Sequence, residues 1–170
     1  MGSVDVLVNN ADITRDNLFM RMKDEEWQSV LDVNLTSTMR LCRGVLRGMM
    51  KARWGRIINI SSINGQKGQM GQTNYSAAKA GMHGFTKALA QETARKGITV
   101  NTISPGYIAT DMIMKIDEPI RNSIMEGIPL GRFGKPEEIA GSVSFLASDE
   151  AGFITGSNYP IDGGFVTLNN

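Results

Sequence analysis

The sequence predicts an α/β fold in which a parallel sheet is flanked by helices. Two observations support this fold class. Short runs rich in β-branched apolar residues recur along the chain, and segments with helical periodicity separate them. The predicted strands cover residues 4–8, 56–61, 98–103 and 158–162. Strands that alternate with helices form βα units with right-handed crossovers, so we expect parallel strands in one domain over residues 1–170.

The segments between the strands carry the start and stop signals of helices. Acidic residues in the first turn predict a helix from Asp24, which continues to Gly55 with a break near Asn34, because helix interiors disfavour Asn. Gly97 is the predicted stop of a long helix. The other helices are expected over residues 74–95 and 136–146, whereas residues 112–129 are Met-rich and less regular, and we expect them to cover the substrate.

Composition excludes several classes of protein. The chain has 170 residues, 41% of them apolar, which is enough for one domain with a core. Its formal net charge is +1 and no basic block stands out, so we expect no nucleic-acid partner and no binding to acidic membranes. We find neither a long apolar run nor a signal-peptide pattern, and therefore expect a cytoplasmic protein.

The chain has one cysteine and one histidine. Cys42 cannot form an internal disulfide, and its helical neighbours Leu41, Val45 and Leu46 predict a buried, unreactive thiol. His83 leaves no cluster of metal ligands, so we expect a helix-surface residue and no metal site.

The stretch that could support chemistry contains Tyr75 and Lys79. A spacing of four places both on one face of a helix. A nearby ammonium favours the phenolate, so the pair could transfer protons near pH 7. The spacing alone is a weak signal, but Ser62 follows a predicted strand just before this helix. Ligands of open α/β sheets bind at the carboxyl ends of strands, so the three groups could polarise a carbonyl oxygen.

Further motifs occur in a fixed order along the chain. They are Asn9-Asn10-Ala11, Ile13-Thr14-Arg15-Asp16, Asn34, Ser62, Tyr75-x-x-x-Lys79, Pro105-Gly106-Tyr107-Ile108-Ala109-Thr110-Asp111 and Ile161-Asp162-Gly163-Gly164. On these residues the chain resembles the short-chain dehydrogenase/reductases, most closely the 3-oxoacyl-[acyl-carrier-protein] and acetoacetyl-CoA reductases. The resemblance implies a Rossmann-like, doubly wound parallel sheet, of which this chain supplies the C-terminal portion with about four strands.

The resemblance assigns catalytic roles. Tyr75 would give a proton to the substrate carbonyl, and Lys79 would lower the pKa of Tyr75 and hold the nicotinamide ribose. Ser62 would donate a hydrogen bond to the developing oxyanion. Asn34 would kink its helix and position a water that links Lys79 to solvent, the alternative being a helix-breaking residue with local bonds only.

The resemblance also implies a cofactor, NADPH, with NADH not excluded. Asn10 and Ala11 would lie along it together with Tyr75 and Lys79. The nicotinamide carboxamide would be held by the loop that contains Pro105, Gly106, Ile108 and Thr110.

The implied reaction converts a 3-oxoacyl thioester into the 3-hydroxyacyl product. Arg53 and Lys96 could receive an acyl carrier protein, although solvated charges at helix ends are the simpler explanation. Small residues in the long helix suggest a homotetramer or homodimer.

Two features depart from the family pattern. Asp12 stands where the family has Gly after Asn-Asn-Ala, and we expect its charge to weaken binding of a phosphate-bearing cofactor. In addition, no Gly-rich phosphate-binding turn precedes Val4. The expected consequences are an exposed apolar edge strand at residues 4–8 and little turnover by the chain alone.

Two other functions stay open. One is a non-catalytic protein that acts only through subunit contacts. The other is a reductase or dehydrogenase of a different secondary alcohol, such as a sugar, because loops and not the fold set specificity.

Overall fold

The computed structural model describes residues 4–166. Its sheet has four strands in the order β1-β2-β3-β4, and all neighbouring pairs are parallel. The strands are β1 (Val6–Asn9), β2 (Gly55–Ile60), β3 (Ile98–Pro105) and β4 (Asn158–Ile161). The prediction of a parallel α/β sheet with about four strands is therefore confirmed.

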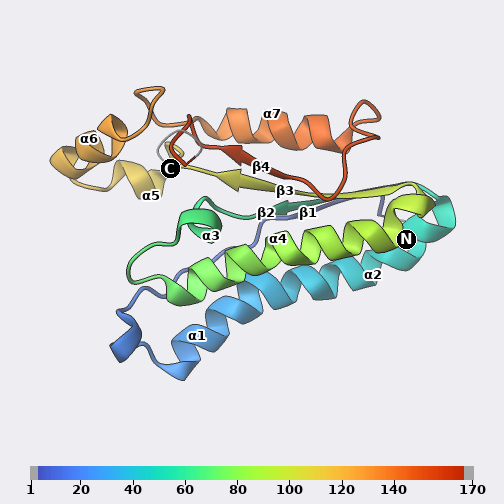
Figure 1. Cartoon of the computed structure of the whole chain (residues 1–170), viewed down its shortest axis with the longest axis horizontal. Coiled ribbons are helices and arrows are strands. Elements are labelled where there is room, and N and C mark those ends of the chain that lie inside the picture. Colours follow the sequence, from blue (N-terminus) through green and yellow to red (C-terminus); the bar gives the residue numbers. More distant parts are fainter. Residues whose placement is uncertain (1–3, 167–170) are drawn as a thin grey trace.

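Helices cover both faces of this sheet (Figure 1). One face packs against α2 (Ser37–Ala52) and α4 (Thr73–Thr93), and the other against α7 (Pro136–Ala147). The helix α1 (Asp24–Leu31) packs beside α4. The remaining helical segments are short: η1 (Phe19–Arg21), α3 (Asn64–Lys67), η3 (Ala94–Lys96), α5 (Asp111–Met114) and α6 (Glu118–Glu126).

The core lies in two layers because successive residues of a strand face opposite sides of the sheet. In β2, Ile57 packs in the cluster that contains Cys42 and Met49 of α2. Its neighbour Ile58 packs on the other side, in the cluster that contains Leu146 of α7. Strands buried on both faces explain the nearly continuous apolar runs in the sequence. The predicted burial of Cys42 is confirmed, since only 2% of it is exposed.

The predicted break near Asn34 is a π-helical turn, η2 (Asp32–Thr36), which joins α1 to α2. Such turns widen a helix locally and are frequent at functional sites. Asn34 is fully buried in the turn. The break is thus a built element of the fold that carries a buried polar side chain.

Two predictions need correction. Residues 112–129 are more regular than expected, because they include most of α5 and all of α6, and Pro119 stands in the first turn of α6, where its fixed backbone angle favours a helix. His83 is not a surface residue, since it is half-buried and its Nε2 lies 3.2 Å from Ser104 Oγ in β3. The helix α4 ends at Thr93, and Gly97 ends the 3-10 turn η3 that continues it, in the left-handed conformation with a φ of 73°.

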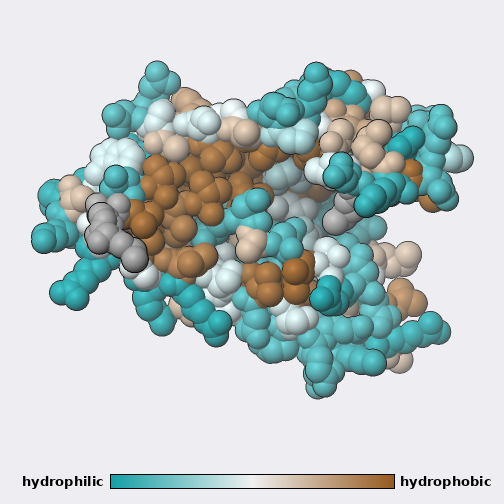
Figure 2. All heavy atoms as spheres, turned by 180° about the vertical axis from the view of Figure 1, so that it is seen from behind, coloured by the Kyte–Doolittle hydropathy of each residue, from teal (hydrophilic) through white to brown (hydrophobic). Residues whose placement is uncertain are grey.

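The strand β1 forms one edge of the sheet, and among the described residues it pairs with β2 alone. Val4, Val6 and Val8 are all more than a third exposed. Seen from behind, an apolar surface opens at the level of the sheet, between the two helical layers (Figure 2). The predicted apolar edge is therefore present. No helix in residues 4–166 is both long enough and apolar enough to cross a membrane.

Candidate active site

A cleft of about 410 Å³ opens at the carboxyl ends of β2 and β3, where ligands of parallel α/β sheets bind. It collects predicted site residues from separate segments: Ser62 after β2, Tyr75 on α4, and the loop after β3. The predicted members of its lining are Ser62, Tyr75, Gly106, Ile108 and Thr110. The cleft also includes residues that the sequence did not single out for a role, namely Thr14, Ile63, Asn64, Gln72, Tyr107 and Ile113.

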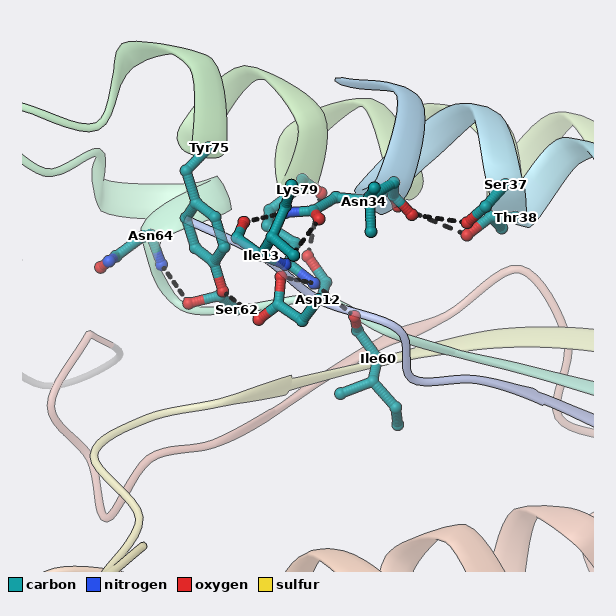
Figure 3. Close-up of polar contacts among 12 residues, drawn as sticks. Asp12, Ile13, Asn34, Ser37, Thr38, Ile60, Ser62, Asn64, Tyr75 and Lys79 are labelled. Atoms are coloured by element: carbon teal, nitrogen blue, oxygen red, sulfur yellow. Dashed lines mark hydrogen bonds and ion pairs between the residues drawn. The ribbon is translucent and has the colours of Figure 1, made fainter. Parts of the chain in front are cut away.

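Tyr75 lies at the first turn of α4, with its ring against the core. The side chain of Asn74 holds this turn in place, because its Oδ1 accepts the N–H of Tyr75 at 2.8 Å and its Nδ2 donates to the carbonyl of Arg15 at 3.0 Å. The hydroxyl of Tyr75 donates a 2.9 Å hydrogen bond to Oδ2 of Asp12 (Figure 3). The phenol therefore points toward the loop that follows β1.

Lys79 lies one turn after Tyr75 on the same face of α4, as the spacing predicts. It is 1% exposed, and its Nζ lies 5.4 Å from the centre of the Tyr75 ring. The ammonium donates to the carbonyl of Ile60 at 2.9 Å and forms an ion pair of 3.3 Å with Oδ1 of Asp12. Asp12 thus contacts both members of the predicted catalytic pair through its two carboxylate oxygens (Figure 3).

Ser62 lies between the end of β2 and the cleft. Its Oγ accepts the backbone N–H of Asn64 at 3.1 Å, which fixes the oxygen and leaves the hydroxyl proton able to donate. A hydrogen-bonding contact with Ser62 also acts to lower the pKa of Tyr75. The serine is therefore placed beside the phenol, as the predicted pairing of these two groups requires.

The electrostatics of the pair differ from the expectation. Burial and the nearby Asp12 carboxylate raise the pKa of Tyr75 well above its ordinary value, and they outweigh the opposing contact with Ser62. Burial lowers the pKa of Lys79, against the opposing effect of Asp12. The predicted lowering of the Tyr75 pKa by Lys79 is thus not what the structure shows, because burial disfavours the charged phenolate and the Asp12 carboxylate further stabilises the protonated phenol.

Asp12 was expected to act on the phosphates of a cofactor. The structure places its carboxylate instead on Tyr75 and Lys79, with 42% of the Asp12 side chain exposed. The loop that carries it is held by Asn34, whose Oδ1 accepts the N–H of Ile13 at 3.0 Å and whose Nδ2 donates to the Ile13 carbonyl at 2.9 Å. The described contacts of the Asn34 amide are therefore to this loop and not to Lys79.

The predicted cofactor residues fall in two adjoining places. Asn10 and Ala11 line a separate hollow of about 370 Å³ at the end of β1. Gly106 approaches Asp162 so closely that a Cβ there would lie 2.7 Å from the Asp162 Cα, so only glycine fits. Pro105 acts through its backbone, since its carbonyl accepts the N–H of Ile63 at 3.1 Å.

Ile108 and Thr110 complete the wall of the cleft next to Gly106. Ile108 is held by a parallel bridge to Gly134, and Thr110 directly precedes the short helix α5. An apolar side chain beside hydroxyl groups and open backbone suits a planar amide-bearing ring. Among the described residues that line the cleft, Asp12 carries the one charged side chain.

Arg53 and Lys96 lie at the other end of the sheet. Arg53 lies two residues before the start of β2 and Lys96 two residues before the start of β3, whereas the cleft opens where these strands end. A strand of this length separates the two ends by roughly 20 Å. This position favours the simpler alternative, solvated charges at helix ends, over a docking surface for a carrier protein. No group of three or more potential metal ligands occurs in residues 4–166.

Comparison with known proteins agrees with this architecture. Residues 1–166 match the protein family described as enoyl-(acyl carrier protein) reductase. An acetoacetyl-CoA reductase of Allochromatium vinosum is 57% identical over 164 residues, which are 96% of this chain and 67% of the relative. A 3-oxoacyl-[acyl-carrier-protein] reductase of Vibrio cholerae is 56% identical over 167 residues, 98% of this chain and 68% of the relative. An acetoacetyl-CoA reductase of Shinella zoogloeoides is 59% identical over 165 residues, which are 96% of this chain and 68% of the relative.

The parallel α/β sheet and these similarities together indicate an oxidoreductase. The chain belongs to the short-chain dehydrogenase/reductase family. Membership in this family implies a nicotinamide cofactor.

Proposed function

We propose that the protein catalyses the NADPH-dependent reduction of a 3-oxoacyl thioester, carried by coenzyme A or an acyl carrier protein, to the 3-hydroxyacyl thioester. The observation that carries the proposal is the convergence of Tyr75 and Ser62 in one cleft at the carboxyl ends of β2 and β3. The names of the similar proteins, acetoacetyl-CoA reductase and 3-oxoacyl-[acyl-carrier-protein] reductase, support this substrate class.

The cofactor supplies the hydride, and the protein positions and protonates the substrate. Ser62 donates a hydrogen bond to the carbonyl oxygen, which stabilises the negative charge that develops there. Tyr75 then gives its proton to that oxygen. The buried ammonium of Lys79 stabilises the phenolate that remains, because an opposite charge in a desolvated site favours the ionised form.

The acyl chain would lie along the outer wall of the cleft. Tyr107 and Ile113 line this wall, and the Tyr107 ring packs edge-on against Phe165 at 5.3 Å between centroids. An apolar wall suits an acyl group better than a sugar. A panel of acetoacetyl-CoA and small ketoses would separate these substrates, and faster turnover of a ketose would contradict the proposed substrate class.

The test is the loss of NADPH absorbance with acetoacetyl-CoA, with NADH measured in parallel. We expect slow turnover by the wild type, and a further loss of about 10²–10⁴-fold in Tyr75→Phe and Ser62→Ala, the usual range for proton transfer and oxyanion stabilisation. Tyr159→Phe is the matched control, since Tyr159 lies in β4 and packs against the α7 layer. Turnover that survives in Tyr75→Phe would overturn the proposal.

A second candidate function rests on Asp12. Because Asp12 contacts both Tyr75 and Lys79, the chain could act through subunit contacts alone, without catalysis. Absence of NADPH oxidation by both the wild type and Asp12→Gly would favour this second function.

We also propose a homodimer or homotetramer that assembles through α4. Open space surrounds Gly84 of this helix, since no atom lies within 4 Å of the position a Cβ would take. Small residues on a helix surface allow a second helix to approach closely. Sedimentation of the wild type and of Gly84→Leu tests this contact, and an unchanged assembly in the variant would exclude α4 from the interface.

A further inference from the structure

The carboxylate of Asp12 satisfies both polar groups of the predicted catalytic pair at once. Oδ2 accepts the proton of the Tyr75 hydroxyl at 2.9 Å, and Oδ1 pairs with the Lys79 ammonium at 3.3 Å. One side chain with two adjacent oxygens thus bridges two groups that lie on successive turns of α4 (Figure 3). Two adjacent oxygens are also what the vicinal hydroxyls of a ribose present.

The position of Asp12 is imposed by its surroundings. On the C-terminal side, Ile13 is fixed by two hydrogen bonds with the buried amide of Asn34. On the N-terminal side, the buried Asn9 donates a 2.7 Å hydrogen bond to Asn59 Oδ1 of β2. The loop between Asn9 and Ile13 is short, so the carboxylate of Asp12 is directed at α4.

The Asp12 side chain can also rotate toward solvent. It is 42% exposed, whereas its partner Lys79 is 1% exposed. A turn of the Asp12 side chain alone could therefore move the carboxylate into water, while the ammonium has to stay where it is. Asp12 can leave the pair without any change in α4.

We propose that Asp12 is an internal competitor of the nicotinamide ribose: its carboxylate occupies the Tyr75 hydroxyl and the Lys79 ammonium, and it must turn away before the ribose hydroxyls can bind there. This inference rests on the proposed function, because the ribose position follows from the roles assigned to Tyr75 and Lys79. It identifies Asp12 as a residue that sets the affinity for the cofactor.

The energetic reason is the difference between the two ligands of the ammonium. A carboxylate offers a full negative charge to a buried cation, and a ribose offers neutral hydroxyls. Exchanging one for the other gives up an ion pair. We expect the removal of the Asp12 charge to tighten NADPH binding about tenfold, which corresponds to about 1.4 kcal/mol.

The test compares NADPH affinity in the wild type, Asp12→Asn and Asp12→Gly, by the quenching of protein fluorescence without any substrate. Asp16→Asn is the matched control, because Asp16 is a nearby carboxylate whose Oδ2 accepts a hydrogen bond from Gln72 at 2.9 Å. Tighter binding in both Asp12 variants and not in the control supports the proposal. Equal affinity in wild type and Asp12 variants overturns it and leaves the proposed function intact.

A second measurement needs no cofactor. Ultraviolet difference spectra record the ionisation of tyrosines with rising pH, and Tyr75→Phe identifies the contribution of Tyr75. Asp12→Asn should make Tyr75 ionise at a lower pH, whereas an unchanged titration would show that the contact between the two does not form. NADPH binding by none of the variants would overturn both the proposed function and this inference.

Discussion

The side-chain amide of Asn34 forms a pair of hydrogen bonds with the backbone of Ile13, one at 3.0 Å and one at 2.9 Å. The pair joins a helical turn to a loop 21 positions earlier in the chain. The amide of Asn34 is fully buried and Ile13 is half-buried, so these two bonds are largely shielded from water.

We therefore expect Asn34→Ala to lower the free energy of unfolding by about 2–3 kcal/mol, because it leaves two backbone groups without partners. For a domain of this size the melting temperature should fall by roughly 5–10 °C. Thermal unfolding followed by circular dichroism measures the change. Asn34→Asp keeps the acceptor for the Ile13 N–H and should lose less if it does not ionise, whereas an unchanged melting temperature in Asn34→Ala would contradict this account.

The ionised carboxylate of Glu138 should contribute to the loss of stability of the fold in acid. A bidentate pair with Arg132, at 2.7 and 2.8 Å, and the N–H of Lys135 lower the pKa of Glu138 from 4.5 to about 2. A lowered pKa means that the stabilisation is complete above the unfolded value and is lost as the pH falls from about 4.5 to about 2.

Glu138→Gln should thus reduce the dependence of stability on pH in that window, because Gln does not titrate. Urea unfolding at several pH values between these limits tests it. Glu137→Gln, one position earlier in α7, is the control. A pH dependence equal to that of the wild type in Glu138→Gln would show that this carboxylate does not contribute.

Gly106 should tolerate no side chain. A Cβ at this position would meet the Asp162 Cα at 2.7 Å and the Asp162 Cβ at 2.8 Å. Gly106→Ala should destabilise the protein by about 1–3 kcal/mol, the usual cost of overpacking. Gly44→Ala is a fitting control, because no atom lies within 4 Å of the corresponding position in α2 and alanine favours a helix by about 0.5–1 kcal/mol over glycine. Chemical denaturation should show a lower free energy of unfolding for Gly106→Ala and a higher one for Gly44→Ala, each relative to the wild type.

The single cysteine should react slowly in the folded protein. Burial raises the pKa of the Cys42 thiol from 9.0 to about 11. The reactive thiolate at pH 8 is then about 100-fold scarcer than in an unfolded chain. Labelling with a chromogenic disulfide reagent, with and without urea, measures the ratio of rates. Equal rates in the two conditions would place the thiol at the surface.

Much of the fold could be predicted from the sequence because strands buried on two faces have a strong local signature. The run Ile57-Ile58 marks β2 regardless of its partners, and each residue fills a different layer of the core. The helix α6 is harder to predict because it has only nine residues, so Ile120 and Ile124 give a single helical repeat, and its start depends on Pro119 in the first turn. The prediction of a short helix depends more on residues that favour its first turn than on the periodicity of its apolar residues.

The site was predictable to the extent that it is local. Tyr75 and Lys79 share a face because helix geometry requires it, and Ser62 follows from the position of a strand end. The role of Asp12 was not predictable, since its hydrogen bond to Tyr75 spans 63 positions and depends on how the loop after β1 packs on α4. The raised pKa of Tyr75 depends on the same packing, because burial of the phenol and then the Asp12 carboxylate disfavour the phenolate.

The π-helical turn at Asp32–Thr36 also has a consequence for insertions and deletions. A turn of this kind holds about one residue more than an α-helical turn, and one residue corresponds to a rotation of about 100° about the helix axis. It puts α1 and α2 out of phase, so that Val30 can pack on Tyr75 while Cys42 packs toward the sheet. Deletion of any one residue from the turn would convert it into a regular α-helical turn. The deletion would also rotate one helix relative to the other, so that either Val30 or Cys42 would turn out of the interior.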